Sequence, residues 1–311
     1  MRRFFYAINN DNADASALPK LGELPLGSNV ELPDSVVHHW CRVLRANIGD
    51  QGILFDGFGG EYIVELQAIS KKNATATLLT HIDDDRTPPT ITQIGLVMSR
   101  GERMDYAIQK ATELGVTAIQ LLSSHHGEVT LKPAQVEKKL AHWQQVAIAA
   151  CEQCGLNRPP LILAPQSINE WLSNTNSDAK TTDAKTTDAK TTEAMATDVT
   201  KTQMAVSSIV SVLSHDSYYQ VLANAPDLCM QMSVPAAGQP AMPSALPDVL
   251  KKQTPYIKLL IGPEGGLSSD ECKQANNVGF IPWQIGTRVL RTETAPVVAL
   301  STISALYSWK R

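Results

Sequence analysis

The sequence Leu260-Ile261-Gly262-Pro263-Glu264-Gly265-Gly266-Leu267 continues the apolar run 257–261 into a loop with three glycines and a proline. An apolar run that is bounded by glycine and proline is typical of a buried strand. Because glycine has no Cβ, the backbone of such a loop can approach a ligand closely. Ser268 and Glu271 have capping-box spacing, which predicts a helix from about 269 to 279. The stretch therefore predicts a strand, a ligand-contacting loop and a helix N-terminus in succession.

A second loop follows a short way downstream, with the sequence Gly286-Thr287-Arg288-Val289-Leu290-Arg291-Thr292-Glu293-Thr294-Ala295. The first loop lacks the Gly-Lys-Ser/Thr ending of loops that hold nucleoside triphosphates. Alone, its Gly-Pro-Glu-Gly-Gly turn would suit a tight structural connection as well as a binding site. The pair of loops makes a binding site the favoured interpretation.

Alternating strands and helices surround these loops. Strands are expected over 91–98, 118–122, 228–232 and 257–261, and helices over 105–114 and 135–154. This alternation predicts a parallel α/β sheet with helices on both faces. Ligands of such sheets bind beyond the carboxyl ends of the strands, where both loops would lie.

The amino-terminal part has a different pattern. Short alternating runs such as Glu61–Leu66 are separated by turn residues such as Gly59 and Gly60, which predicts β-hairpins and a small barrel. The charged, proline-containing stretch Asp83–Pro89 is the expected linker. We therefore expect a barrel domain over 1–82, a linker over 83–89 and a second domain over 90–311.

The net charge of −4 is concentrated in one part of the chain. Between Glu170 and Leu250 there are nine acidic and four basic residues, so the remainder is close to neutral. This region contains the repeat TTDAK TTDAK, which lacks large apolar residues and predicts a disordered insertion over about 173–203. A near-neutral remainder would bind RNA through local basic patches.

The cysteines and histidines do not predict a metal site. Five scattered cysteines argue against a disulfide framework. Cys151 and Cys154 have C-x-x-C spacing but no second pair, and they extend an apolar helical stripe, so we expect them to pack in the core. The His125-His126-Glu128 cluster lacks a third histidine. The absence of a spanning apolar run or a signal peptide predicts a cytoplasmic protein without a membrane partner.

Four segments together resemble the ribosomal RNA small subunit methyltransferase E family: ERMDYAIQKATELGV (102–116), WQQVAIAACEQCG (143–155), GPEGGLS and IGTRVLRTETA. Members are knotted methyltransferases of the SPOUT class, which methylate N3 of a uridine in bacterial 16S rRNA with S-adenosylmethionine. The resemblance implies a SPOUT-type parallel sheet with a C-terminal trefoil knot, preceded by a PUA-like RNA-binding barrel. It also implies a homodimer that acts on the small ribosomal subunit.

The resemblance further implies a set of site residues. The cofactor would contact Ile261, Gly262, Gly266, Ile285, Gly286, Leu290, Arg291, Thr292 and Ala295. For catalysis, Glu264 or Glu293 could accept the N3 proton and Arg291 could stabilise developing negative charge, although an Arg291–Glu293 ion pair that only shapes the loop is an alternative. The expected RNA contacts are Arg2, Arg3, Arg42, Arg45, Arg100 and Arg103.

Two other functions stay open. One is a knotted methyltransferase that acts on another RNA, such as a tRNA ribose 2′-hydroxyl. The other is a non-catalytic RNA-binding or assembly factor. The intact glycines of both loops argue against a non-catalytic factor, and the segments at 102–116 and 151–155 argue against a different RNA.

Overall fold

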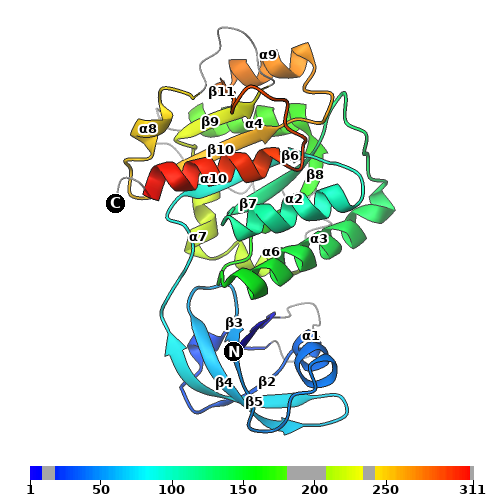
Figure 1. Cartoon of the computed structure of the whole chain (residues 1–311), viewed down its shortest axis with the longest axis vertical. Helices are drawn as coiled ribbons and strands as arrows, with labels where there is room; N and C mark the ends of the chain where they lie inside the picture. Colours follow the sequence, from blue (N-terminus) through cyan, green and yellow to red (C-terminus); the bar gives the residue numbers. More distant parts are fainter. Residues whose placement is uncertain (9–17, 181–207, 234–241, 309–311) are drawn as a thin grey trace, which may run out of the picture. The chain divides into compact units, whose positions relative to one another are not determined.

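The structure is a computed structural model that describes residues 1–8, 18–180, 208–233 and 242–308. The chain forms two compact units (Figure 1). The barrel unit contains residues 1–87 together with 147–159 and 208–216, and the sheet unit contains the remaining described residues. Residues 147–159 and 208–216 fall within the range expected for the second domain, 90–311, but in the structure they belong to the barrel unit.

The barrel unit is built on a five-stranded sheet of order β1-β3-β4-β5-β2. Its strands are β1 (Arg2–Phe5), β2 (Asn29–Glu31), β3 (Gln51–Phe55), β4 (Glu61–Ile69) and β5 (Ala74–Ile82). The predicted hairpins are present, because β3, β4 and β5 pair antiparallel in sequence order. Gly59 and Gly60 connect β3 to β4 with φ of 95° and 68°, which residues with a Cβ rarely adopt.

Short helices and two apolar clusters complete the barrel unit. The helices are η1 (Leu21–Glu23), α1 (Asp34–Val36), η2 (Val37–Val43) and α6 (Ser208–Leu213). Phe4 stacks on Trp40 with ring centroids 4.9 Å apart, in the main core. Cys151 is fully buried in a second cluster with Phe5 and Phe55, and this burial raises the pKa of its thiol well above the usual value. The predicted packing in the core is thus confirmed for Cys151 and wrong for Cys154, which is exposed near the end of α3 (Pro133–Cys154).

The sheet unit contains six parallel strands in the order β11-β9-β10-β6-β7-β8. They are β6 (Ile91–Val97), β7 (Ala118–Ser123), β8 (Leu161–Ser167), β9 (Leu228–Met232), β10 (Tyr256–Ile261) and β11 (Phe280–Trp283). The predicted parallel α/β sheet is therefore confirmed, with two strands, β8 and β11, that the sequence had not indicated. The central strand β10 is buried along its whole length, as its apolar run predicts.

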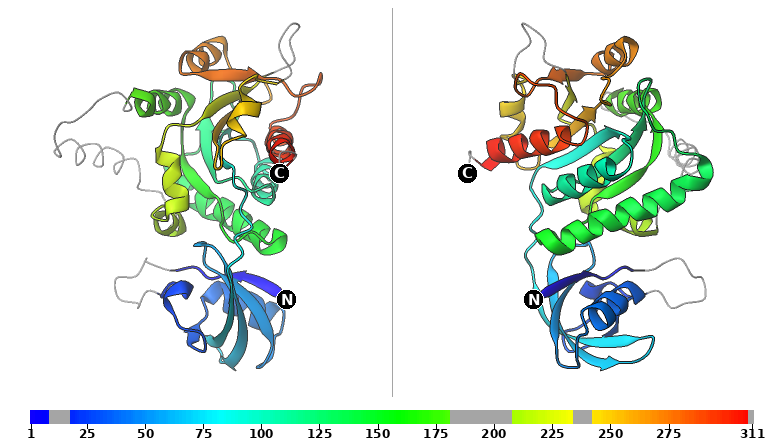
Figure 2. Two further views of the ribbon diagram at one scale, coloured as in Figure 1. Left: turned by 90° about the vertical axis from the view of Figure 1, so that its left-hand side faces the viewer. Right: turned by 45° about the vertical axis from the view of Figure 1, so that its right-hand side comes forward.

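Helices cover both faces of this sheet (Figure 2). They are α2 (Glu102–Glu113), α3 (Pro133–Cys154), α4 (Ile168–Lys180), α7 (Ser217–Gln220), η4 (Val221–Ala223), α8 (Leu246–Val249), α9 (Ser269–Asn277) and α10 (Ala295–Ser308). Helices α2 and α10 pack together on one side, and α4 packs with α9 on the other. The predicted insertion begins inside α4, which continues to Lys180, so its first residues are helical; residues 181–207 lie outside the described part.

Candidate functional site

A pocket of about 330 Å³ opens at the carboxyl ends of β9, β10 and β11. Its lining comes from three consecutive strand ends, at 231–233, 261–267 and 285–295. Seven of the predicted cofactor residues line it: Ile261, Gly262, Gly266, Ile285, Leu290, Thr292 and Ala295. The structure does not bring the other two, Gly286 and Arg291, to the pocket wall.

One hydrogen bond joins the first loop (262–267) to the second loop (286–295). The Thr292 hydroxyl donates to the Gly262 carbonyl oxygen at 3.2 Å, and Thr292 is only 3% exposed. A Cβ on Gly262 would lie 3.1 Å from the Leu267 side chain, so the first loop folds tightly on itself at the pocket wall. The two loops therefore form one wall of the pocket and are joined by this hydrogen bond.

Replacing Thr292 with Val is expected to weaken cofactor binding about 2- to 10-fold, because one buried hydrogen bond contributes roughly 0.5–1.5 kcal/mol. Isothermal titration calorimetry with S-adenosylmethionine would measure the change. Thr287→Val is the matched control, since Thr287 is exposed on the same loop and does not line the pocket. Equal affinities of the two variants would contradict a role for the bond in shaping the pocket.

The helix that follows the first loop begins as predicted. Ser268 and Glu271 form a capping box, in which the Ser268 hydroxyl accepts from the Glu271 N–H at 3.2 Å and the Glu271 carboxylate accepts from the Ser268 N–H at 2.8 Å. The other Glu271 oxygen accepts from the backbone N–H of His125 at 2.8 Å. Burial alone would raise the pKa of this carboxyl, but the interactions with the His125 and Ser268 backbone N–H groups and with the Ser268 side chain outweigh burial and lower it.

Two further polar residues line the pocket and were missed by the sequence analysis. Gln231 is 4% exposed, and its Nε2 donates to Asn276 at 2.9 Å, while its Oε1 is buried without a partner. The Ser233 hydroxyl is buried without a partner as well. Both residues lie at the carboxyl end of β9. Because ligands of parallel sheets bind beyond the carboxyl ends of the strands, the predicted strand 228–232 could have indicated them.

The predicted catalytic residues lie around the pocket in different environments. Glu264 lines the pocket and pairs with Arg103, whose Nη1 is 2.6 Å from its carboxylate. Arg291 is exposed, with a side chain that is 73% accessible, and lies 4.0 Å from Glu293. Glu293 is largely buried, and its Oε2 has no partner. The structure thus contains both the predicted arginine and the alternative Arg291–Glu293 pair.

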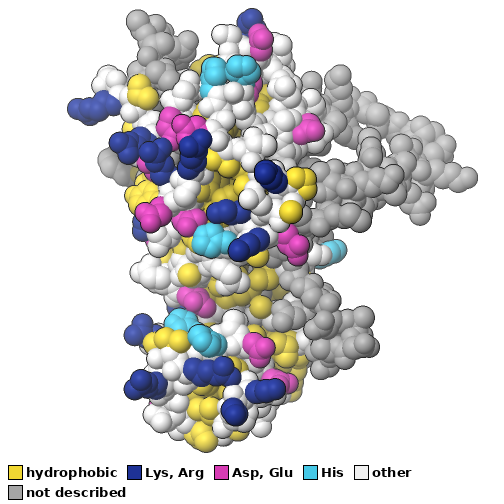
Figure 3. All heavy atoms as spheres, turned by 90° about the vertical axis from the view of Figure 1, so that its right-hand side faces the viewer, with side chains coloured by type: hydrophobic (Ala, Val, Ile, Leu, Met, Phe, Trp, Pro, Cys, Tyr) yellow, Lys and Arg dark blue, Asp and Glu magenta, His cyan; other side chains and the backbone are white. Residues whose placement is uncertain are grey.

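Most of the predicted RNA-binding arginines are exposed. In the barrel unit, Arg2, Arg42 and Arg45 are exposed, as are His38 and His39. Figure 3 shows Lys, Arg and His side chains on one face of each unit. In the sheet unit, Arg100 is exposed and lies 3.3 Å from Glu128, and Arg103 is half-exposed beside Glu264. These positions leave five arginines accessible to a polyanion.

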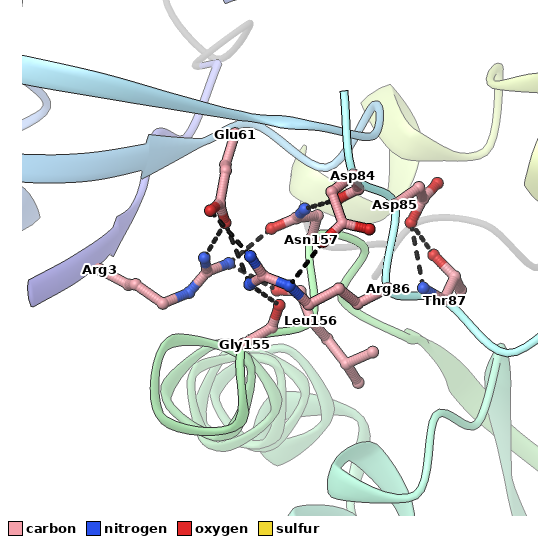
Figure 4. A network of polar contacts seen from close by, with 9 residues as sticks. All are labelled: Arg3, Glu61, Asp84, Asp85, Arg86, Thr87, Gly155, Leu156 and Asn157. Atoms are coloured by element: carbon pink, nitrogen blue, oxygen red, sulfur yellow. Dashed lines mark hydrogen bonds and ion pairs between the residues drawn. The ribbon is translucent and has the colours of Figure 1, made fainter. Parts of the chain in front are cut away.

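Arg3 is the exception among the predicted RNA contacts. Its side chain is only 10% exposed and pairs with Glu61, which is 3% exposed (Figure 4). Arg3 also donates to Asn157 at 2.5 Å, and Arg86 donates to Glu61 at 2.9 Å. The prediction of Arg3 as an RNA contact is therefore wrong, because alternation along β1 turns its side chain into this network while Arg2 faces solvent.

The described residues contain no cluster of three or more His, Cys, Asp or Glu side chains arranged to hold a metal ion. His125 and His126 lie edge to face, with ring centroids 4.8 Å apart. In the same part of the chain, no helix combines the length and the apolar character that crossing a membrane requires.

Comparison with known families defines the class of protein. The sequence model of the RNA methyltransferase domain matches residues 86–212 and 200–304, and that of the RNA methyltransferase PUA domain matches residues 32–79. Because the first model matches more than half of the chain, the protein belongs to the RNA methyltransferase domain family. The barrel unit contains the PUA match, and the sheet unit contains both predicted loops.

More specific relatives share nearly the whole chain. Ribosomal RNA small subunit methyltransferase E of Buchnera aphidicola is 26% identical over 285 residues, covering 92% of this chain and 91% of the relative. The Bacillus subtilis protein of the same name is 28% identical and covers 86% of each chain. The Neisseria gonorrhoeae protein of that name, solved with S-adenosyl methionine bound, is 29% identical, with a TM-score of 0.66 and 98% coverage of both chains. The predicted resemblance to the small subunit methyltransferase E family is confirmed.

Proposed function

We propose that this protein transfers a methyl group from S-adenosylmethionine to N3 of a uridine in the 16S rRNA of the small ribosomal subunit. The observation that carries the proposal is the pocket formed by both predicted loops at the carboxyl ends of three parallel strands. Relatives that carry the name small subunit methyltransferase E over nearly the whole chain support the RNA substrate.

The pocket residues fit the cofactor. When bound, S-adenosylmethionine supplies an electrophilic methyl group on a positively charged sulfur. The pocket offers apolar walls from Ile261, Leu290 and Ala295, and it exposes loop backbone for polar contacts. The unpartnered Gln231 Oε1 and Ser233 Oγ can receive hydrogen bonds from amino or hydroxyl groups of the cofactor. A ligand would thus satisfy polar atoms that the protein leaves without partners.

Arg291 is the proposed stabiliser of negative charge. When N3 of uracil loses its proton, charge spreads onto the neighbouring carbonyl oxygens, and a guanidinium can donate to such an oxygen. The Arg291 side chain is exposed at the end of the second loop, where it can meet RNA, and Glu293 lies close enough to orient it. The proposed RNA-binding residues are Arg2, Arg42 and Arg45 in the barrel unit and Arg100 and Arg103 in the sheet unit.

The predicted homodimer and cytoplasmic location are part of the same proposal. The homodimer rests on the resemblance to the family, and the cytoplasmic location rests on the expectation that the sequence carries neither a spanning apolar run nor a signal peptide. Sedimentation equilibrium of the full chain would test the dimer, since a dimer has twice the chain mass of 33.7 kDa.

Mass mapping of modified nucleosides in 16S rRNA tests the proposed function. Cells that lack the protein should lose one N3-methyluridine, and the purified protein with S-adenosylmethionine should restore it on small subunits from these cells. An unchanged 16S rRNA map together with a missing tRNA methyl group would instead support the alternative tRNA 2′-hydroxyl substrate. Unchanged maps of both RNAs would support a non-catalytic factor.

A further inference from the structure

His126 lies at the rim of the cofactor pocket, although it follows a different strand from the pocket loops. A Cβ on Gly265 would meet the His126 Cβ at 3.5 Å, and the His126 Nδ1 lies 3.1 Å from the carbonyl oxygen of Gly266. Both glycines line the pocket. The imidazole is exposed, so its outer edge is accessible to a second substrate that enters beside the cofactor.

The surroundings of His126 hold it in place. The preceding residue, His125, is tied through its backbone N–H to Glu271, the same carboxylate that caps α9 at the end of the first loop. The His125 ring packs edge to face against the His126 ring at 4.8 Å. The segment after β7 is therefore tied to α9 through Glu271 and to the first loop through Gly266, which together position the imidazole.

The contact with Gly266 sets the tautomer of the neutral ring. A carbonyl oxygen can only accept a hydrogen bond, so Nδ1 must carry the hydrogen. Nε2 of the neutral imidazole then has a free lone pair and can act as an acceptor. The hydrogen bond to the Gly266 carbonyl thus leaves His126 Nε2 available as a base at the pocket rim.

The two carboxylates predicted as proton acceptors are less suited to that task. Glu264 already pairs with the Arg103 guanidinium, whose Nη1 lies 2.6 Å from a carboxylate oxygen, so that oxygen is occupied before a substrate binds. Glu293 does not line the pocket, and its Oε1 lies beside the Arg291 guanidinium. His126, in contrast to these two carboxylates, has an exposed ring whose Nε2 lone pair is available to accept a proton.

We propose that His126 Nε2 accepts the N3 proton of the target uridine, an inference that rests on the proposed function. The N3–H bond breaks, its electron pair stays on N3, and the proton bonds to the Nε2 lone pair, which makes the ring an imidazolium. The Nδ1–H bond to the Gly266 carbonyl is retained and stabilises this charged ring. Solvent takes the proton from Nε2 before the next turnover, because the ring is exposed.

The test compares His126→Gln with His125→Gln. A Gln side chain at 126 can still donate to the Gly266 carbonyl but offers no base, so the single-turnover rate on small subunits that lack the methyl group should fall about 100-fold or more. Affinity for S-adenosylmethionine should stay within about 2-fold in calorimetry. His125→Gln removes the ring that packs against His126 but leaves the base in place, so it should lower the rate far less than His126→Gln does. Added imidazole should restore part of the rate of His126→Ala.

A readout independent of turnover is the nitrogen NMR spectrum of the ¹⁵N-histidine-labelled full chain, which should show His126 protonated at Nδ1. A neutral ring protonated at Nε2, a His126→Gln rate within a few-fold of the unaltered protein, or no rescue by imidazole would each overturn the proposal. Loss of turnover in Glu264→Gln together with full turnover in His126→Gln would show that the Glu264 carboxylate, and not His126, accepts the N3 proton. If the unaltered protein methylates no RNA, the proposed function itself fails.

Discussion

Replacing Glu61 with Gln should destabilise the barrel unit by about 3–5 kcal/mol, because it leaves the buried Arg3 guanidinium without a counter-charge. Glu61 is 3% exposed and accepts hydrogen bonds from both Arg3 and Arg86 (Figure 4). Arg3 also donates to Asn157, which in turn donates to the Asp84 carbonyl at 2.6 Å. Removing the carboxylate therefore affects the network that ties β1 and β4 to the segment after β5. Urea unfolding followed by circular dichroism would measure the loss.

Two control variants distinguish the contribution of this network to stability from the general effect of removing a charge. Glu23→Gln changes an exposed carboxylate in the same unit and should alter the free energy of unfolding by less than about 0.5 kcal/mol. The double substitution Arg3→Met with Glu61→Leu removes both buried charges, and it should cost much less than Glu61→Gln alone. A Glu61→Gln loss as small as that of Glu23→Gln would show that the network contributes little.

The same carboxylate makes stability depend on pH. Burial raises the pKa of Glu61, but the hydrogen bonds and charges of Arg3 and Arg86 outweigh burial and lower it below the usual value. A carboxyl whose pKa is lower in the folded state contributes stability above its unfolded pKa, which is about 4.3, and loses it as pH falls through the folded pKa. The urea midpoint of the unaltered protein should therefore fall below about pH 4 more steeply than that of Glu61→Gln.

The sequence predicted those parts of the fold that depend on local pattern. The apolar run of β10 and the capping box at Ser268 appear where expected, because burial and helix capping are determined by neighbouring residues. The short strand β11 contains Pro282 and only four residues, too few for a periodic signal. Strand β8 was likewise missed. The burial of Arg3 depends on Glu61 and Asn157, which are distant in sequence.

The residues of the candidate site likewise include some that could be predicted from the sequence and others that depend on the fold. Seven pocket residues lie on or directly beside the two loops, and the resemblance to the family had implied all seven. Gln231 joins the pocket only because β9 lies between β10 and β11 in the sheet. His126 reaches Gly266 across 140 positions in the sequence, a contact that no local pattern encodes. The knot implied by the family stays a prediction, since periodicity carries no information about threading.

Arg291→Ala should lower the single-turnover rate of methyl transfer about 10²- to 10³-fold, the loss typical of removing one donor that stabilises a developing anion. Affinity for S-adenosylmethionine should change little, because Arg291 does not line the pocket and its side chain is 73% exposed. Rapid-quench assays on small subunits that lack the methyl group would give the rate. Calorimetry would give the cofactor affinity.

Arg288→Ala is the matched comparison, since Arg288 lies three positions earlier on the same loop and does line the pocket. It should weaken cofactor binding while the rate at saturating cofactor stays close to that of the unaltered protein. Arg291→Lys should recover only part of the rate, because an ammonium keeps the charge but lacks the planar, bidentate donor geometry of the guanidinium. If Arg291→Ala kept full turnover with normal cofactor and RNA binding, Arg291 would only shape the loop through its pair with Glu293.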